Sequence, residues 1–162
     1  MLEVNKTLFL DIDGVLATHK EFMKPRHIFR KKYDVANTLR IPYPFNPGSV
    51  KILNSIIEET DVNIVLTSDW RNFWDLNELD QIFKFNGVIK SPMSITNTHP
   101  ISMENLTENR KNEIKEYIET FDVGTYVIVD DMKLDMERFV KTKDTEGLKQ
   151  LGVKKKILNF LK

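Results

Sequence analysis

The feature that most constrains the fold is an alternation of short apolar runs with amphipathic helical patterns. Residues 7–10, 62–66 and 125–129 have the length and composition of buried strands. Helical spacing predicts helices that begin near residues 46, 72, 109 and 153, and shorter strands are expected at 88–89 and 139–140. Strands that alternate with helices favour an α/β, Rossmann-like fold, in which helices cover both faces of a parallel sheet. A length of 162 residues suits one such domain, residues 1–162.

Residues 17–46 depart from this regular pattern. They contain three of the six prolines and show no periodicity, so we expect an insertion, or flap, over the carboxyl edge of the sheet. Elsewhere the strands and helices follow one another too closely for a large cap domain. The predicted cap is therefore minimal, and an open site favours a bulky substrate.

Polar residues follow the three best strands directly. They are Asp11 and Asp13, Thr67 and Ser68, and Asp130 and Asp131. In open α/β sheets a site forms beyond the carboxyl ends of the strands, so these groups should meet in one crevice. Asp11-Ile12-Asp13-Gly14 alone is weak support for catalysis, because aspartate and glycine after a strand often only make a turn.

Four segments, in chain order, resemble the motifs of the haloacid dehalogenase-like (HAD) superfamily. The run D-I-D-G-V-L from Asp11 is similar to the first motif, and I-V-L-T ending at Thr67 to the second. Lys111, near the start of a helix, resembles the third. V-I-V-D-D, ending at Asp130 and Asp131, resembles the fourth. Order and strand placement agree over about 125 residues.

This resemblance implies a phosphatase that forms an aspartyl-phosphate on Asp11. Asp13 would protonate the leaving oxygen and then deprotonate water, and family members that cleave carbon–halogen bonds lack this second acid. Thr67 would bind the phosphoryl oxygens, with Ser68 as the competing residue. Lys111 would neutralise the phosphate, and Lys115 is the alternative one helical turn later.

The resemblance also implies Mg²⁺, which prefers oxygen ligands. Asp11, Asp130 and the main-chain carbonyl of Asp13 would bind the ion. Asp131 would bind it through water or would orient Lys111.

A narrower resemblance links L-T-S-D-W-R, F-N-P-G-S-V-K-I-L and Y-V-I-V-D-D-M to a compact branch of the superfamily that includes domains proposed to act in RNA repair. The chain departs from that branch at Thr142-Lys143-Asp144, where Thr-Asp is common. Arg71 could bind a substrate phosphate or pair with a structural acid, and both interpretations stay open. Trp70 is expected in the core or a lid rather than as a platform for bases.

Residues 19–40, called here the basic segment, contain seven basic and two acidic residues and have a net charge of +5 in a chain whose formal net charge is zero. The segment is either a solvated surface or a site that attracts a polyanion such as a nucleic-acid end. A phosphatase for small metabolites, such as nucleotides or sugar phosphates, is the alternative enzyme. A phosphoacceptor or non-catalytic binding domain is the alternative outside enzymes.

Composition excludes several other classes. The chain has no cysteine, so disulfides, thiolate catalysis and zinc–sulfur sites are excluded. Apolar runs are too short for a membrane span, and the N-terminus lacks the pattern of a signal peptide. We therefore expect a cytoplasmic protein with a phosphorylated substrate and no membrane partner.

Overall fold

The computed structural model describes residues 5–98 and 103–162. Its sheet contains β1 (Lys6–Leu10), β2 (Asn63–Leu66), β3 (Ser94–Ile95), β4 (Thr125–Asp130) and β5 (Phe139–Lys141). The strands run in the order β3-β2-β1-β4-β5, and every neighbouring pair is parallel. Leu10 of β1 lies opposite Leu66 of β2 and Val129 of β4, so three strands end together. This confirms the predicted α/β, Rossmann-like fold.

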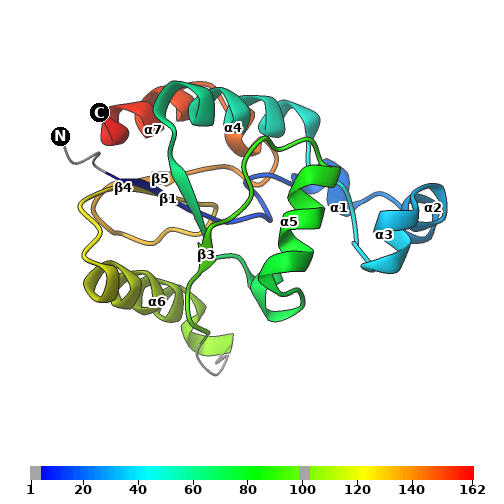
Figure 1. The fold of residues 1–162 in the computed structure, drawn as a ribbon, viewed down its shortest axis with the longest axis horizontal. Helices are drawn as coiled ribbons and strands as arrows, with labels where there is room; N and C mark the ends of the chain where they lie inside the picture. Colours follow the sequence, from blue (N-terminus) through cyan, green and yellow to red (C-terminus); the bar gives the residue numbers. More distant parts are fainter. Residues whose placement is uncertain (1–4, 99–102) are drawn as a thin grey trace.

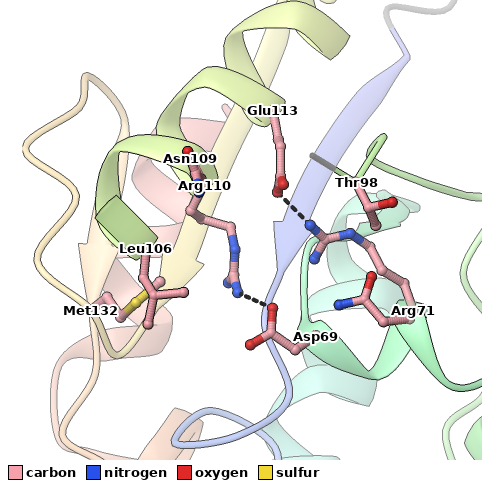
Figure 2. A pocket seen from close by; sticks show the side chains of 9 residues that line it. Asp69, Arg71, Thr98, Leu106, Asn109, Arg110, Glu113 and Met132 are labelled. Atoms are coloured by element: carbon pink, nitrogen blue, oxygen red, sulfur yellow. Dashed lines mark hydrogen bonds and ion pairs between the residues drawn. The ribbon is translucent and has the colours of Figure 1, made fainter. Parts of the chain in front are cut away.

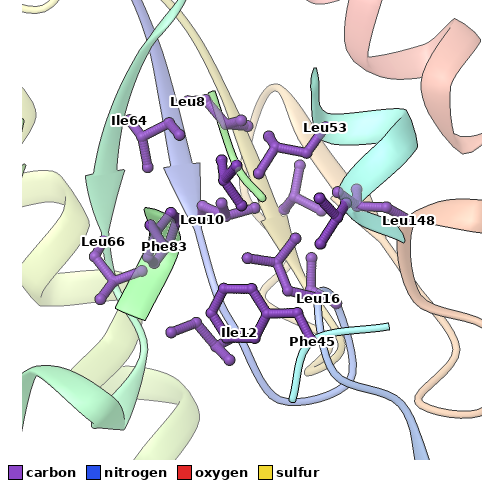
Figure 3. Close-up of a cluster of buried hydrophobic side chains, with 14 of the residues drawn as sticks. Leu8, Leu10, Ile12, Leu16, Phe45, Leu53, Ile64, Leu66, Phe83 and Leu148 are labelled. Atoms are coloured by element: carbon purple, nitrogen blue, oxygen red, sulfur yellow. The ribbon is translucent and has the colours of Figure 1, made fainter. Parts of the chain in front are cut away.

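Helices cover both faces of the sheet (Figure 1). Helices α4 (Pro47–Thr60), α5 (Leu76–Phe85) and α7 (Val153–Leu161) contribute to one core, and α6 (Leu106–Phe121) contributes to the other. Side chains of β1 alternate between these cores. Leu8 and Leu10 pack with Leu53 in the first core (Figure 3), whereas Phe9 meets Tyr117 of α6 at a ring-centroid distance of 5.6 Å.

Local capping determines where two helices begin. The side chain of Asn46 accepts hydrogen bonds from the backbone N–H groups of Gly48 and Ser49 and so starts α4. Asp75 and Glu78 form a capping box that starts α5 at Leu76. The helix predicted from residue 72 therefore begins four residues later, and a 3₁₀ turn, η1 (Asp69–Asn72), precedes it.

The strand predicted at 88–89 is wrong. Val88 is buried, but its backbone N–H donates to the carbonyl of Phe83 and closes the end of α5, so it is not available to the sheet. The edge strand is instead β3, where Ser94 and Ile95 pair with β2. Short 3₁₀ turns η2 (Met103–Asn105) and η3 (Gly147–Lys149) precede α6 and α7.

The basic segment forms three short helices, α1 (His19–Phe22), α2 (Arg26–Lys32) and α3 (Asp34–Thr38). In Figure 1, α2 and α3 lie at one end of the molecule, away from α4, α6 and α7. Ala36 and Ile41 are fully buried in the core and anchor this part of the chain. In the part of the chain that the structure describes, every helix is too short or too polar to cross a bilayer.

Candidate active site

The loop after β1 places Asp11 at the centre of the sheet edge. Its backbone N–H donates to the carbonyl of Val129 at 3.1 Å, and the residue is only 6 % exposed. Gly14 turns the loop with a φ of +79°. A Cβ atom at Gly14 would lie 2.4 Å from Oδ2 of Asp131, so the absence of a side chain makes room for that carboxylate.

Asp11, Asp130 and Asp131 offer carboxylate oxygens that all lie within 4.8 Å of one another. Burial, followed by the charge of Asp130, raises the pKa of Asp11 well above its usual value. The same two causes raise the pKa of Asp131 to about 6. Buried carboxylates that repel one another favour a bound cation, and hard oxygen ligands suit Mg²⁺. The residues present therefore fit the predicted metal, with the Asp13 carboxylate outside this group.

Arg110 of α6 supplies positive charge beside the acids. Its Nη1 lies 2.7 Å from Oδ2 of Asp130 and 3.6 Å from Oδ1 of Asp11, and its Nη2 lies 3.1 Å from Oδ1 of Asp69. Burial alone would lower the pKa of Arg110, but attraction to these carboxylates raises it above its usual value. Figure 2 shows Arg110 and Arg71 on opposite sides of a cavity of about 40 Å³.

The structure does not bring Lys111 to this site. Its Nζ lies 3.4 Å from Oε1 of exposed Glu108, on another side of α6. The buried face of α6 consists of Arg110, Glu113, Ile114 and Tyr117. Lys111 is rotated by about 100° from Arg110 around the helix, and the alternative, Lys115, is exposed. Sequence reasoning missed Arg110, which lies four residues before Ile114 and seven before Tyr117 and therefore shares their face of the helix.

Thr67 and Ser68 differ in what their hydroxyls already bind. The Thr67 backbone N–H donates to the carbonyl of Leu10, and its buried Oγ1 has no hydrogen-bond partner among the described residues. The Ser68 hydroxyl instead accepts from the backbone N–H of Trp70 at 3.3 Å and starts η1. A buried hydroxyl without a partner is costly unless a ligand binds it. The Thr67 hydroxyl is therefore the one available to a ligand, and phosphate binding by Thr67 stays a prediction.

Arg71 is already engaged by protein atoms. It forms a buried ion pair with Glu113 and donates to the main-chain carbonyls of Thr67 and Ser68. These contacts hold the loop after β2 in place and correspond to the structural interpretation of Arg71. Binding of substrate by Arg71 or Ser68 stays a prediction.

Asp13 is held by two donors from other parts of the chain. Its Oδ1 accepts from the Tyr43 hydroxyl at 2.5 Å and from Nε1 of Trp70 at 3.1 Å. Burial raises the pKa of Asp13, and the two hydrogen bonds partly offset this rise. Trp70 packs in the core, as expected, but also contacts the site. Sequence reasoning missed Tyr43, which lies in the insertion without periodicity.

Thr142 connects the loop after β5 to the site. Its buried Oγ1 donates to the carbonyl of Gly14 at 2.7 Å, and its N–H donates to the carbonyl of Asp130 at 3.1 Å. The departure from the related branch begins one residue later, at Lys143, which is exposed. Thr142 therefore supports both the loop after β1 and the end of β4.

Comparison with known families agrees with this arrangement. Residues 7–153 match the family described as the HAD domain in Swiss Army Knife RNA repair proteins. The match includes every acidic residue of the site and all five strands except Lys6, the first residue of β1. No significant match was found among curated proteins or among solved structures. Because the match covers most of the sequence, the chain belongs to the family of HAD domains of Swiss Army Knife RNA repair proteins.

Proposed function

We propose that this chain is a magnesium-dependent phosphomonoester hydrolase that forms an aspartyl-phosphate on Asp11. Membership of the HAD family supports a hydrolase of the HAD type. The observation that most supports the finer proposal is the position of Asp11, which is buried beside Asp130, Asp131 and Arg110 and two residues before Asp13. A nucleophile, an acid, a cation and a metal-binding group are thus available at one sheet edge.

In the first step, a carboxylate oxygen of Asp11 attacks phosphorus and forms the acyl-phosphate bond. The bond from phosphorus to the leaving oxygen breaks, and Asp13 gives that oxygen its proton. Tyr43 and Trp70 hold Asp13 in place for this transfer. Arg110 offsets negative charge near Asp11 and Asp130, and the free Thr67 hydroxyl donates to a phosphoryl oxygen.

In the second step, Asp13 takes a proton from water as the water oxygen attacks phosphorus. The acyl-phosphate bond breaks, Asp11 leaves as a carboxylate, and inorganic phosphate is released. The raised pKa of Asp13 suits a group that must hold a proton in one step and accept one in the next. Asp13 can therefore act as the acid of the first step and the base of the second, and the reaction needs no other residue as a base.

Asp11, Asp130 and Asp131 would hold the magnesium ion, together with the main-chain carbonyl of Asp13. Bound there, the ion supplies positive charge that favours ionised Asp11 and reduces its repulsion of the phosphoryl group. Arg110 and the metal ion then have related roles, since both counter the charge of the same carboxylates.

The proposed substrate is a phosphomonoester at the end of a large molecule, such as a nucleic-acid end. The minimal cap over the sheet edge, the basic segment and the RNA-repair description of the family support this choice. A small-metabolite phosphatase is the competing proposal. A comparison of small phosphate esters with phosphorylated oligonucleotides as substrates distinguishes these two proposals.

The test measures phosphate release with Mg²⁺ from small phosphate esters and from oligonucleotides phosphorylated at either end. Wild-type protein should show turnover that chelation abolishes and magnesium restores. Asp11→Asn should fold but lose turnover by orders of magnitude, because an amide does not attack phosphorus. Asp13→Asn should also lose most turnover, because it lacks the acid of the first step and the base of the second. Any phosphoenzyme that forms should persist and be detectable by mass spectrometry.

Wild-type rates in folded Asp11→Asn protein would refute the nucleophile. Full turnover in protein shown by elemental analysis to be free of metal would refute the magnesium mechanism. Stable phosphorylation of Asp11 without turnover would identify a phosphoacceptor domain instead.

A further inference from the structure

A cavity of about 530 Å³ opens beside Asp13. Its walls come from the basic segment and from the chain after β2. This volume lies within the roughly 300–1,000 Å³ of pockets for small organic ligands and exceeds the need of a phosphate group. Asp13 protonates the leaving oxygen in the proposed reaction, so the group attached to that oxygen should lie on this side of the site.

One wall of the cavity is aromatic. Trp70 and Trp74 pack with ring centroids 4.9 Å apart, and their Nε1 atoms donate to Asp13 and to the carbonyl of Leu39. Phe73 lies next to Trp74, with its ring centroid 5.9 Å away, yet remains 74 % exposed. A rigid aromatic wall that ends in an exposed ring offers a surface on which a flat ligand can stack.

Three arginines line the same cavity. Arg30 is fixed, because its guanidinium donates to the main-chain carbonyls of Arg40 and Ile41. Arg26 and Arg40 are exposed and also line the cavity. In residues 5–98 and 103–162, neither guanidinium pairs with a carboxylate. These two residues can therefore bind a negative group of the ligand that lies away from the scissile phosphate.

We propose that this cavity binds the nucleoside next to the scissile phosphate, with its base stacked on Phe73 and a further phosphate bound by Arg26 and Arg40. This inference rests on the proposed phosphatase activity and deepens it. A sugar phosphate has no flat ring for the aromatic wall. A phosphotyrosine has a ring but no second phosphate for the arginines. A nucleotide at the end of a strand has both, whereas a free nucleoside monophosphate has the flat base but only the scissile phosphate.

Binding can be measured without turnover because both tryptophans of the chain line this cavity. Asp11→Asn protein with Mg²⁺ would be titrated with a nucleoside monophosphate, a terminally phosphorylated oligonucleotide and ribose 5-phosphate while tryptophan fluorescence is recorded. The nucleotide and the oligonucleotide should quench the fluorescence and bind more tightly than ribose 5-phosphate. Equal binding of all three ligands would overturn the proposal.

Phe73→Ala should raise the Kd of the nucleotide about tenfold or more, since stacking on an aromatic side chain is lost. Phe73→Tyr keeps a flat ring and should bind as wild type does. Phe121→Ala is the matched control, because Phe121 is also exposed, at 63 %, but lies on α6 away from the cavity. A Kd for ribose 5-phosphate that rises as much as that of the nucleotide would indicate a structural effect and overturn the stacking role.

Arg26→Ala should weaken the oligonucleotide more than the mononucleotide and reduce the salt dependence of its binding. Lys31→Ala removes the same charge from the same helix, α2, but Lys31 does not line this cavity, so little change is expected. Equal effects of the two variants would show that only the general charge of the segment matters and would overturn the site. Tighter binding of the oligonucleotide than of the mononucleotide is the expected result, and equal binding would overturn the role of Arg26 and Arg40 in binding a second phosphate.

The inference and the proposed function can fail separately. Nucleotide binding that depends on Phe73, in a protein without phosphatase activity, would support the nucleoside site and refute the proposed phosphatase activity. Faster turnover of glycerol phosphate or of a phosphotyrosine peptide than of nucleotides would support the phosphatase activity and refute the nucleoside site.

Discussion

Arg110 and Lys111 are neighbours on α6, but we expect their substitution to have opposite effects on turnover. Changing either to glutamine removes one positive charge and keeps a good helix former, so the two variants are closely matched. Only Arg110 contacts Asp130 and Asp11. We expect Arg110→Gln to lose most turnover and Lys111→Gln to retain it.

The size of the effect follows from burial. The Arg110 side chain is only 7 % exposed, so solvent screens its charge little. Removal of one fixed donor from a site where negative charge develops costs about 10²–10³ in kcat, or roughly 2.7–4 kcal/mol of activation free energy. Lys111 pairs with Glu108, whose side chain is 63 % exposed, and such surface pairs contribute about 0–1 kcal/mol to stability. Its loss should leave kcat unchanged.

Stability should respond to pH in a defined direction. Arg110 lowers the pKa of Asp11, which burial and Asp130 raise. A carboxyl whose pKa is raised by folding destabilises the folded state once pH exceeds its unfolded value. Without Arg110 that pKa rises further, so Arg110→Gln should lose more stability at pH 8 than at pH 5. Removal of one partner from a buried pair costs about 3–5 kcal/mol, and added magnesium should restore part of it by binding only the folded protein.

The assay combines steady-state phosphate release with urea unfolding at both pH values, with and without Mg²⁺. Arg110→Lys is an informative third variant, since one ammonium cannot replace both guanidinium contacts, to Asp130 and to Asp69. A hundredfold loss in folded Lys111→Gln protein, with Arg110→Gln near wild type, would refute the assignment. Greater destabilisation of Arg110→Gln at pH 5 would refute the electrostatic reasoning.

Three further predictions follow from single contacts. Thr67→Val should leave the free energy of unfolding unchanged or increased, because the hydroxyl lacks a partner, but should lower kcat/KM at least tenfold; a stability loss without a rate loss would contradict this. Gly14→Ala should reduce magnesium affinity, measured by calorimetry, because its Cβ would displace Asp131; unchanged affinity would contradict it. Tyr43→Phe removes a hydrogen bond that lowers the pKa of Asp13, so the alkaline limb of the kcat/KM profile should move to higher pH, and a shift to lower pH would contradict it.

Much of the fold follows from periodicity alone. The strands that end at Leu10, Leu66 and Asp130 are apolar runs stopped by polar residues, and parallel pairing then brings those residues together. The same logic predicts that Asp11, Asp130 and Asp131 meet, as they do.

The remaining parts of the site depend on rotation and on contacts distant in sequence. Arg110 and Lys111 both lie at helical spacing from Ile114, so the pattern alone does not decide which of them faces the acids. Tyr43 reaches Asp13 from 30 residues away, through a segment with no periodic pattern. Such contacts form only when the core positions the loop. Thr67 could be predicted because it directly follows a strand, so its position depends neither on the rotation of a helix nor on a contact distant in sequence.

The basic segment shows why a local net charge does not define a binding surface. Arg30 uses its guanidinium to hold the backbone at Arg40 and Ile41, and Lys32 lies over the ring of Tyr33 at 5.3 Å. Arg26 and Arg40, in contrast, line the cavity beside Asp13. Replacing Arg30 would therefore disturb the segment itself, whereas Arg26 can be changed with less risk to the fold. The charges most relevant to a substrate are those whose side chains remain unengaged next to the site.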